Sequence, residues 1–107
     1  MQVKLIGGVE ITTKIVAPSA LLRGQLFLHG NTPVIAKTDA ASGAPVSVGV
    51  TGGIYEANDI DATPPVAGST LHTDATDVNG AAAGKHLGVA LTVTASKVVF
   101  LHRPNGA

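Results

Sequence analysis

The sequence predicts an all-β fold: a small β-sandwich or β-barrel of about eight short strands, with little or no helix. Three observations point there. Apolar residues alternate with polar or small ones over several short segments, as in half-buried strands. β-Branched side chains dominate these segments, which favours pleated strands. Turn pairs such as Gly30-Asn31 and Ser42-Gly43 separate the segments at close spacing.

Strand patterns follow one another along most of the chain. They cover residues 9–15, 22–29, 46–51, 87–93 and 98–101. Gly52-Gly53 is expected to separate the third segment from a second short apolar strand that ends at Glu56, at a place where backbones approach closely. Thr94–Ser96 is expected to form a short hairpin turn between the last two segments. The strongest hairpin signal is Asn79-Gly80, because a type I′ turn needs positive φ at both central positions.

Helix signals are few. Pro18–Leu22 suits one short helical turn capped by Ser19. Ala81–Ala83 has high helix propensity, but the glycines at both ends favour a turn or bulge. Residues 58–69 form one long irregular excursion, and Pro64-Pro65 excludes a central strand there.

The chain of 107 residues is expected to be a single β domain over residues 1–107. Residues 57–70 are expected to form a long surface loop, and residues 1–9 an extended arm that binds a neighbour. Three aromatic residues leave Val, Ile, Leu and Ala to build the core. A core of such side chains in so small a domain favours further burial in an assembly.

Charge and composition exclude several classes of function. Seven basic and seven acidic residues give zero net charge, which argues against nucleic acid as the main partner. There is no cysteine, so disulfides and thiolate chemistry are excluded. No apolar run approaches about 20 residues, and the first residues lack the pattern of a signal peptide, so a soluble protein with no membrane partner is expected.

The charges are segregated along the chain. Residues 41–80 carry only acidic charges, whereas the three charged residues after them are all basic. This pattern indicates either an acidic loop face or complementary faces that meet across a subunit contact.

Candidate chemical sites are weak. The four histidines are far apart, and none stands in a ligand-spaced pair. His72 with Asp74 and Asp77 comes nearest to a metal or acid–base site, but aspartates in such a segment also form turns through their own backbone. No serine lies in a G-x-S-x-G motif, and Gly49–Gly53 lacks the lysine of a phosphate loop. We therefore expect no enzyme activity, no cofactor and no metal.

A family resemblance rests on the order and spacing of softer motifs. Glycine and leucine alternate from Gly24 to Gly30, and a P-V-x-x-x-T-D-A-A-x-G turn covers Pro33–Gly43. A V-x-V pattern then leads into G-x-Y-E by Glu56. The strands Leu87–Leu91 and Val98–Leu101 close the pattern. With these motifs the chain, from about residue 9 to 103, resembles the cement, or head decoration, proteins of tailed bacteriophages.

The resemblance implies a structural role. Such a protein binds the outside of the phage head and stabilises contacts between major capsid subunits. Its partners would be the major capsid protein and further copies of itself, with a homotrimer favoured over a dimer. It would be made in the host bacterial cytoplasm and end on the exterior of the virion. The residues expected to contact the capsid or a sister subunit are Met1, Val3, Leu5, Ile6, Asp59, Ile60, Pro64 and Pro65.

Two other classes of function stay open. A virion-surface or tail-associated β module would bind a carbohydrate, with Tyr55 as the exposed ring on which a sugar stacks. A small enzyme would use His72, Asp74 and Asp77. Binding to a glycan array would support the first alternative, and loss of function on replacing His72 by Ala would support the second.

Overall fold

The fold is built of strands, as the sequence predicts. The computed structural model describes residues 1–58, 60, 65–80 and 84–104, and no α-helix occurs among them. The all-β prediction is therefore confirmed. Eight strands follow in order: β1 (Val3–Val16), β2 (Leu26–His29), β3 (Thr32–Ala36), β4 (Pro45–Ala57), β5 (Thr70–Thr73), β6 (Val78–Asn79), β7 (Lys85–Val93) and β8 (Val98–His102).

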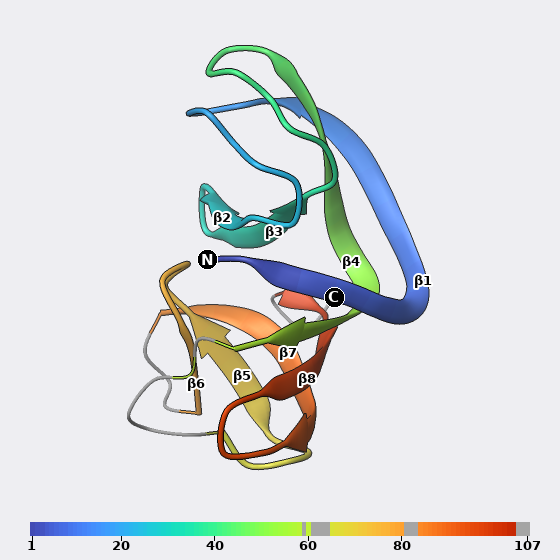
Figure 1. The fold of residues 1–107 in the computed structure, drawn as a ribbon, viewed down its shortest axis with the longest axis vertical. Coiled ribbons are helices and arrows are strands. Elements are labelled where there is room, and N and C mark those ends of the chain that lie inside the picture. Colours follow the sequence, from blue (N-terminus) through green and yellow to red (C-terminus); the bar gives the residue numbers. More distant parts are fainter. Residues whose placement is uncertain (59, 61–64, 81–83, 105–107) are drawn as a thin grey trace.

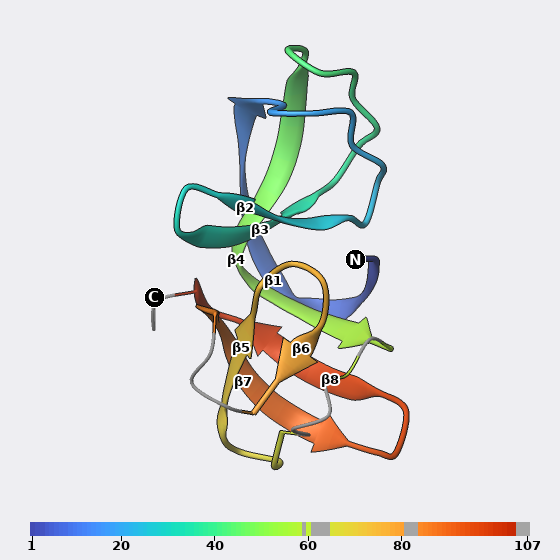
Figure 2. The ribbon, with the colours of Figure 1, turned by 90° about the vertical axis from the view of Figure 1, so that its left-hand side faces the viewer.

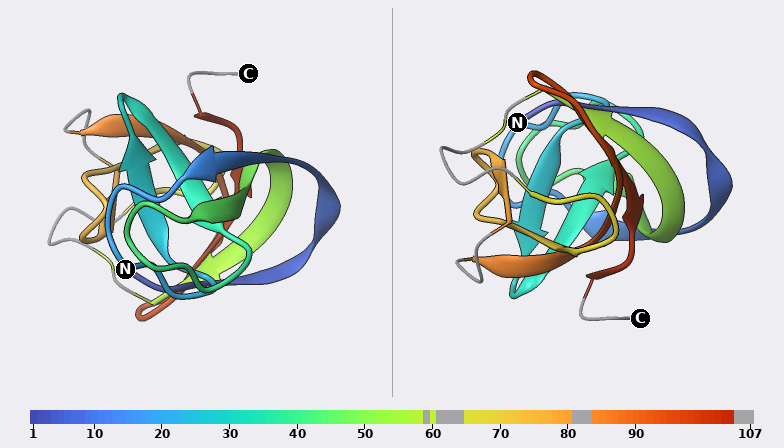
Figure 3. Two further views of the ribbon diagram at one scale, coloured as in Figure 1. Left: turned by 90° about the horizontal axis from the view of Figure 1, so that it is seen from above. Right: turned by 90° about the horizontal axis from the view of Figure 1, so that it is seen from below.

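All strands belong to one antiparallel sheet that curls on itself (Figures 1 and 3). The order is β2-β3-β4-β8-β7-β5-β6, and β1 lies beside β4 off this path. The first half of β4 pairs with β3 and the second half pairs with β8, while β1 follows β4 along both halves. The long β1–β4 ribbon thus connects the two ends of the molecule, as Figure 1 shows.

The β2–β3 hairpin crosses the middle of the molecule (Figure 2), and its residues contribute to two hydrophobic clusters. Leu26 and Ile35 are paired across the hairpin and belong to the larger cluster, which β5, β7 and β8 complete. Phe27 and Val34, the next pair, belong to the smaller cluster at the other end. Because side chains alternate between the two faces of a strand, one hairpin serves both cores.

The predicted break at Gly52-Gly53 is wrong. Residues 45–57 form the single strand β4, which bends at Gly52 with φ of +93° instead of ending there. Gly8 on β1 has φ of +84° and pairs with Gly53. A Cβ atom on Gly52 would lie 2.1 Å from the carbonyl oxygen of Val9. Glycines on both strands therefore let the two backbones approach closely, and the ribbon bends as a unit.

Two local predictions about turns and helices are also wrong. Neither Asn79 nor Gly80 has positive φ, and β6 pairs with β5 rather than with the strand that follows it. The tight turn instead precedes β6, where Asp74 accepts backbone hydrogen bonds. Residues 18–22 form a bend and a single bridge instead of a helical turn. The Thr94–Ser96 turn is confirmed, since the Thr94 amide donates to the Lys97 carbonyl at 2.9 Å. Ala81–Ala83 lies outside the described residues.

Strand lengths differ from the expectation of uniformly short elements. β1 has 14 residues and β4 has 13, because the two stabilise one another over their whole length. The strand at the N-terminus begins at Val3, so most of the segment expected to be an arm is paired with β4 within the same chain. The connection from β4 to β5 spans residues 58–69. Within the described residues no helix is long and apolar enough to cross a membrane.

Candidate interaction surface

The most exposed element of the fold is β1. Eleven of its 14 residues are exposed, and only Val3 is buried. Among the described strands, β1 pairs with β4 alone; on its other edge the Val3 amide donates to the Gly24 carbonyl, and the residues after Val3 have no strand beside them. An edge of this kind is a template for pairing with another chain.

Apolar side chains line this edge strand. Val9 is 88% exposed and Ile11 is 60% exposed. The alternation at residues 9–15 predicts one buried face, yet both residues lie in solvent, opposite the part of β4 that pairs with neither β3 nor β8. The large apolar residues exposed on β1 are Leu5, Ile6, Val9, Ile11 and Val16. Five large apolar side chains exposed on one edge strand are typical of an interaction site.

Glu10 attaches the middle of this strand to the core. Its side chain points inward, where Oε1 lies 2.8 Å from Nζ of Lys37 and Oε2 accepts a hydrogen bond from the hydroxyl of Tyr55. Lys37 Nζ also donates to the Tyr55 hydroxyl at 3.0 Å. Burial, together with the hydrogen bond to Glu10 and its charge, raises the pKa of Tyr55, so the phenol keeps its proton. These three polar groups satisfy one another beneath β1.

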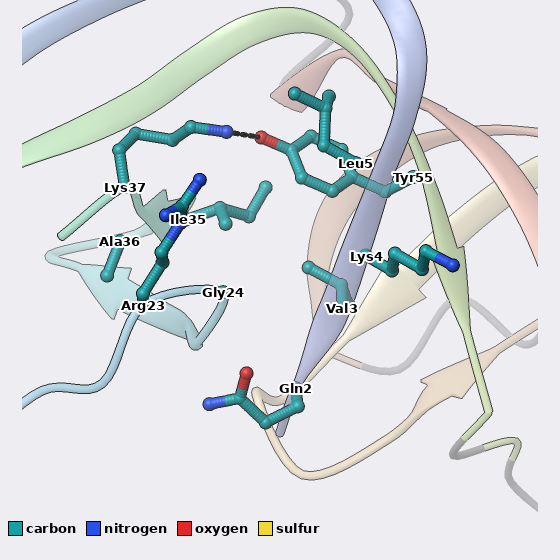
Figure 4. A pocket seen from close by; sticks show the side chains of 10 residues that line it. All are labelled: Gln2, Val3, Lys4, Leu5, Arg23, Gly24, Ile35, Ala36, Lys37 and Tyr55. Carbon is teal, nitrogen blue, oxygen red and sulfur yellow. Dashed lines mark hydrogen bonds between the residues drawn. The ribbon is translucent and has the colours of Figure 1, made fainter. Parts of the chain in front are cut away.

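Beside this cluster lies a pocket of about 460 Å³. Figure 4 shows Lys37 and Arg23 on one wall and Val3 and Leu5 of β1 on the other. The Arg23 amide donates to Oδ1 of Asp39 at 2.7 Å, which holds that wall in place. The pocket therefore opens next to the first residues of β1, and its lining combines apolar side chains with three cations, those of Lys4, Arg23 and Lys37.

The predicted contact residues fall into several environments. Leu5 and Ile6 are exposed on β1 and belong to the interaction surface. Val3 is part of the larger hydrophobic cluster, and Met1 and Ile60 pack against that cluster. Pro65 is buried. Asp59 and Pro64 lie outside the described residues. No partner chain is present, so a contact role for these eight residues stays a prediction.

Sequence reasoning placed Val9 in an arm that binds a neighbour, but it missed Ile11 and Val16 as surface residues. Their alternation is the same whether an apolar row faces the chain's own core or a partner. Only the sheet topology separates the two cases, because it leaves β1 with a single neighbour.

The candidate chemical site around His72 is not assembled. Oδ1 of Asp74 accepts hydrogen bonds from the amides of Thr76 and Asp77, at 2.8 and 3.3 Å, which makes it a turn former. These hydrogen bonds hold the pKa of Asp74 below its usual value. Within the described part of the chain, no three His, Cys, Asp or Glu side chains gather to hold a metal ion. His72 instead lies against His86, with ring centroids 5.7 Å apart.

The expectation that Tyr55 is an exposed ring is wrong. Tyr55 is 1% exposed and stacks on Phe100, with ring centroids 6.0 Å apart. Phe27, the third aromatic residue of the chain, is buried as well. Burial of all three rings removes the platform on which a sugar would stack.

Comparison with known proteins adds one match. A family model described as phage cement protein matches residues 6–103, from the fourth residue of β1 to just past the end of β8. No curated protein and no solved structure matches the chain.

Proposed function

The chain belongs to the phage cement protein family, and from this premise we propose that it binds the outer surface of a phage head through β1 and stabilises contacts between major capsid subunits. The observation that carries the proposal is the exposed apolar edge of β1, which has no partner strand in the described fold other than β4. A cement protein needs such a surface, because it holds other subunits together by contact alone.

The chemistry of this surface favours a protein partner. Its exposed side chains are mostly aliphatic, and its free backbone groups suit the addition of an extended strand. The pocket at the start of β1 adds the exposed Arg23, whose guanidinium suits a carboxylate of the partner. Burying aliphatic side chains provides the free energy of association, and the backbone pairing sets the register.

Self-association belongs to the same proposal. Eleven of the 14 residues of β1 are exposed; such an edge favours aggregation unless it is covered, and a sister subunit or the shell would cover it. A closed homotrimer around a local symmetry axis is the arrangement we propose. Light scattering of the purified chain, in solution and when released from heads, measures the number of copies.

A structural and non-enzymatic role is part of the proposal. It is supported by Asp74, whose carboxylate accepts the hydrogen bonds of its own turn, and by His72, whose ring lies against the ring of His86. A carbohydrate-binding role is not favoured, since the aromatic rings are buried.

The decisive experiment is binding to phage heads prepared without this chain, before and after expansion. We expect the wild-type chain to sediment with expanded heads and to raise the temperature at which they open. Val9→Lys and Ile11→Lys place a charge on the apolar edge and should weaken binding at least tenfold, on the order of 1.4 kcal/mol or more.

Leu91→Lys is the matched control, because Leu91 is an exposed apolar residue on β7, away from β1. It should bind as the wild type does. Absence of wild-type binding to expanded heads would overturn the cement role. Equal loss in all three variants, or in none of them, would overturn the assignment of the surface to β1.

A further inference from the structure

Three polar side chains form a row across the C-terminal strands. His72 on β5 is paired directly with His86 on β7 and, on its other side, with Asn79 on β6. The two imidazole rings have centroids 5.7 Å apart and planes tilted by 31°. Directly paired residues project from the same face of a sheet, so the three side chains share one face.

Two atoms in this row are buried without a partner. Nδ1 of His72 and Oδ1 of Asn79 have no hydrogen bond in the structure, although both are shielded from solvent. Asn79 is 5% exposed, and the two histidines are half-buried. A buried polar atom without a partner destabilises the fold, and a ligand that pairs with the atom removes this cost. Nδ1 of His72 and Oδ1 of Asn79 can each donate a lone pair, so a ligand that accepts electron pairs suits both atoms.

A transition-metal cation has the chemistry that this row offers. Imidazole suits Zn²⁺, Cu²⁺ and Ni²⁺, whereas Mg²⁺ prefers sets of oxygen ligands. With a metal about 2.0–2.1 Å from each nitrogen, two imidazoles at a tetrahedral angle have their centroids about 5 Å apart. The strand pairing thus holds the two rings, at 5.7 Å, within reach of one ion.

We propose that His72 and His86 bind one Zn²⁺ or Ni²⁺ ion between their rings, with the side-chain oxygen of Asn79 as a third donor and water at the remaining position. The ion joins β6, β5 and β7 and binds only the folded chain, so it stabilises the C-terminal half of the sheet. The proposal does not depend on the proposed function, because its test uses the isolated chain.

The test is titration of the tag-free chain with Zn²⁺, Ni²⁺ and Mg²⁺, followed by calorimetry and thermal unfolding. We expect one site for Zn²⁺ or Ni²⁺, an increase in Tm of about 5 °C near saturation, reversal by a chelator and no response to Mg²⁺. His72→Ala and His86→Gln should each weaken binding at least tenfold. Asn79→Asp replaces a neutral oxygen donor by a charged one and should strengthen binding severalfold.

His29→Ala is the control, since His29 is exposed at the end of β2 and belongs to neither pair. It should bind the metal as the wild type does. Circular dichroism identifies any variant that fails to fold, and His86→Gln keeps the test valid if His72→Ala unfolds. Absence of binding at millimolar metal would overturn the site, as would unchanged affinity in both His72→Ala and His86→Gln.

Discussion

Nζ of Lys37 lies 2.8 Å from Oε1 of Glu10, and this ion pair connects the exposed strand β1 to the interior of the sheet. The two residues are far apart in sequence, on β1 and just after β3, and the Tyr55 hydroxyl contacts both. β1 therefore combines an outer edge available to a partner with an inward side chain that keeps the strand in place.

The first prediction concerns this ion pair. Lys37→Met leaves the Glu10 carboxylate partly buried without its cation, so we expect a loss of about 2 kcal/mol in the free energy of unfolding. Urea denaturation of Lys37→Met, Glu10→Gln and the double variant measures the coupling, expected to be about 1 kcal/mol. Lys97→Met is the control, because the Lys97–Glu56 pair is more open, at 3.4 Å and 52% exposed for the lysine side chain. Lys97→Met should lower the free energy of unfolding by less than about 0.5 kcal/mol.

The second prediction concerns the bend of the β1–β4 ribbon. Gly52→Ala places a Cβ atom against the Val9 carbonyl oxygen at a positive φ. We therefore expect the free energy of unfolding to fall by about 3 kcal/mol or more. Gly43→Ala is the matched control, since Gly43 has φ of +82° but open space around its Cβ position. Gly43→Ala should lower the free energy of unfolding only by the backbone strain, about 1 kcal/mol. Equal losses in the two variants would contradict the role of close approach at Gly52.

The third prediction concerns the pH dependence of stability. Burial lowers the pKa of His102, whose Nε2 donates to the Pro33 carbonyl oxygen at 2.8 Å. Below the unfolded value of about 6.5, the unfolded chain binds a proton that the folded chain resists, so stability falls as the pH drops. Above that value the contribution is fully present. The slope for this one group is at most about 1.4 kcal/mol per pH unit.

Chemical denaturation at several pH values between 7.5 and 5 measures this slope. His102→Gln keeps a donor near Pro33 but does not titrate, so its stability should change less over this range than that of the wild type. His29→Gln should follow the wild type, because His29 is exposed. A His102→Gln profile parallel to the wild-type profile would contradict the assignment.

The fourth prediction is a stabilising substitution. Ala75 has φ of +75°, the one positive φ of a non-glycine residue in the described ranges, and it follows Asp74 in the turn before β6. Ala75→Gly relieves the backbone strain and keeps the hydrogen bond that the amide of residue 75 donates to Oγ1 of Thr73, at 3.0 Å. Glycine also raises the entropy of the unfolded chain, which offsets part of the relieved strain. We therefore expect a net increase in the free energy of unfolding of about 0.5 kcal/mol. Ala67→Gly, in an exposed turn without positive φ, should instead lose about 0.5 kcal/mol.

Much of the strand content is evident from local pattern. The segments 87–93 and 98–101 are observed within β7 and β8 with their turn between them. Alternation, β-branched side chains and turn residues act over a few neighbours, so they are readable without the fold. Where prediction failed, a distant segment decided the outcome. Gly52 continues a strand because Gly8 and Val9 approach it, and Asn79 pairs with β5 instead of turning toward β7.

The candidate surface and the histidine row depend on strand register. The sequence by itself determined that the chain is all-β, poor in charge and aromatic residues, and similar to cement proteins. Only the tertiary structure decided that Val9 and Ile11 face solvent, that Tyr55 is buried beside Glu10, and that His72 lies against His86. The physical reason is that strand pairing joins residues far apart in the chain, and the choice of partner strand and register is a property of the whole sheet.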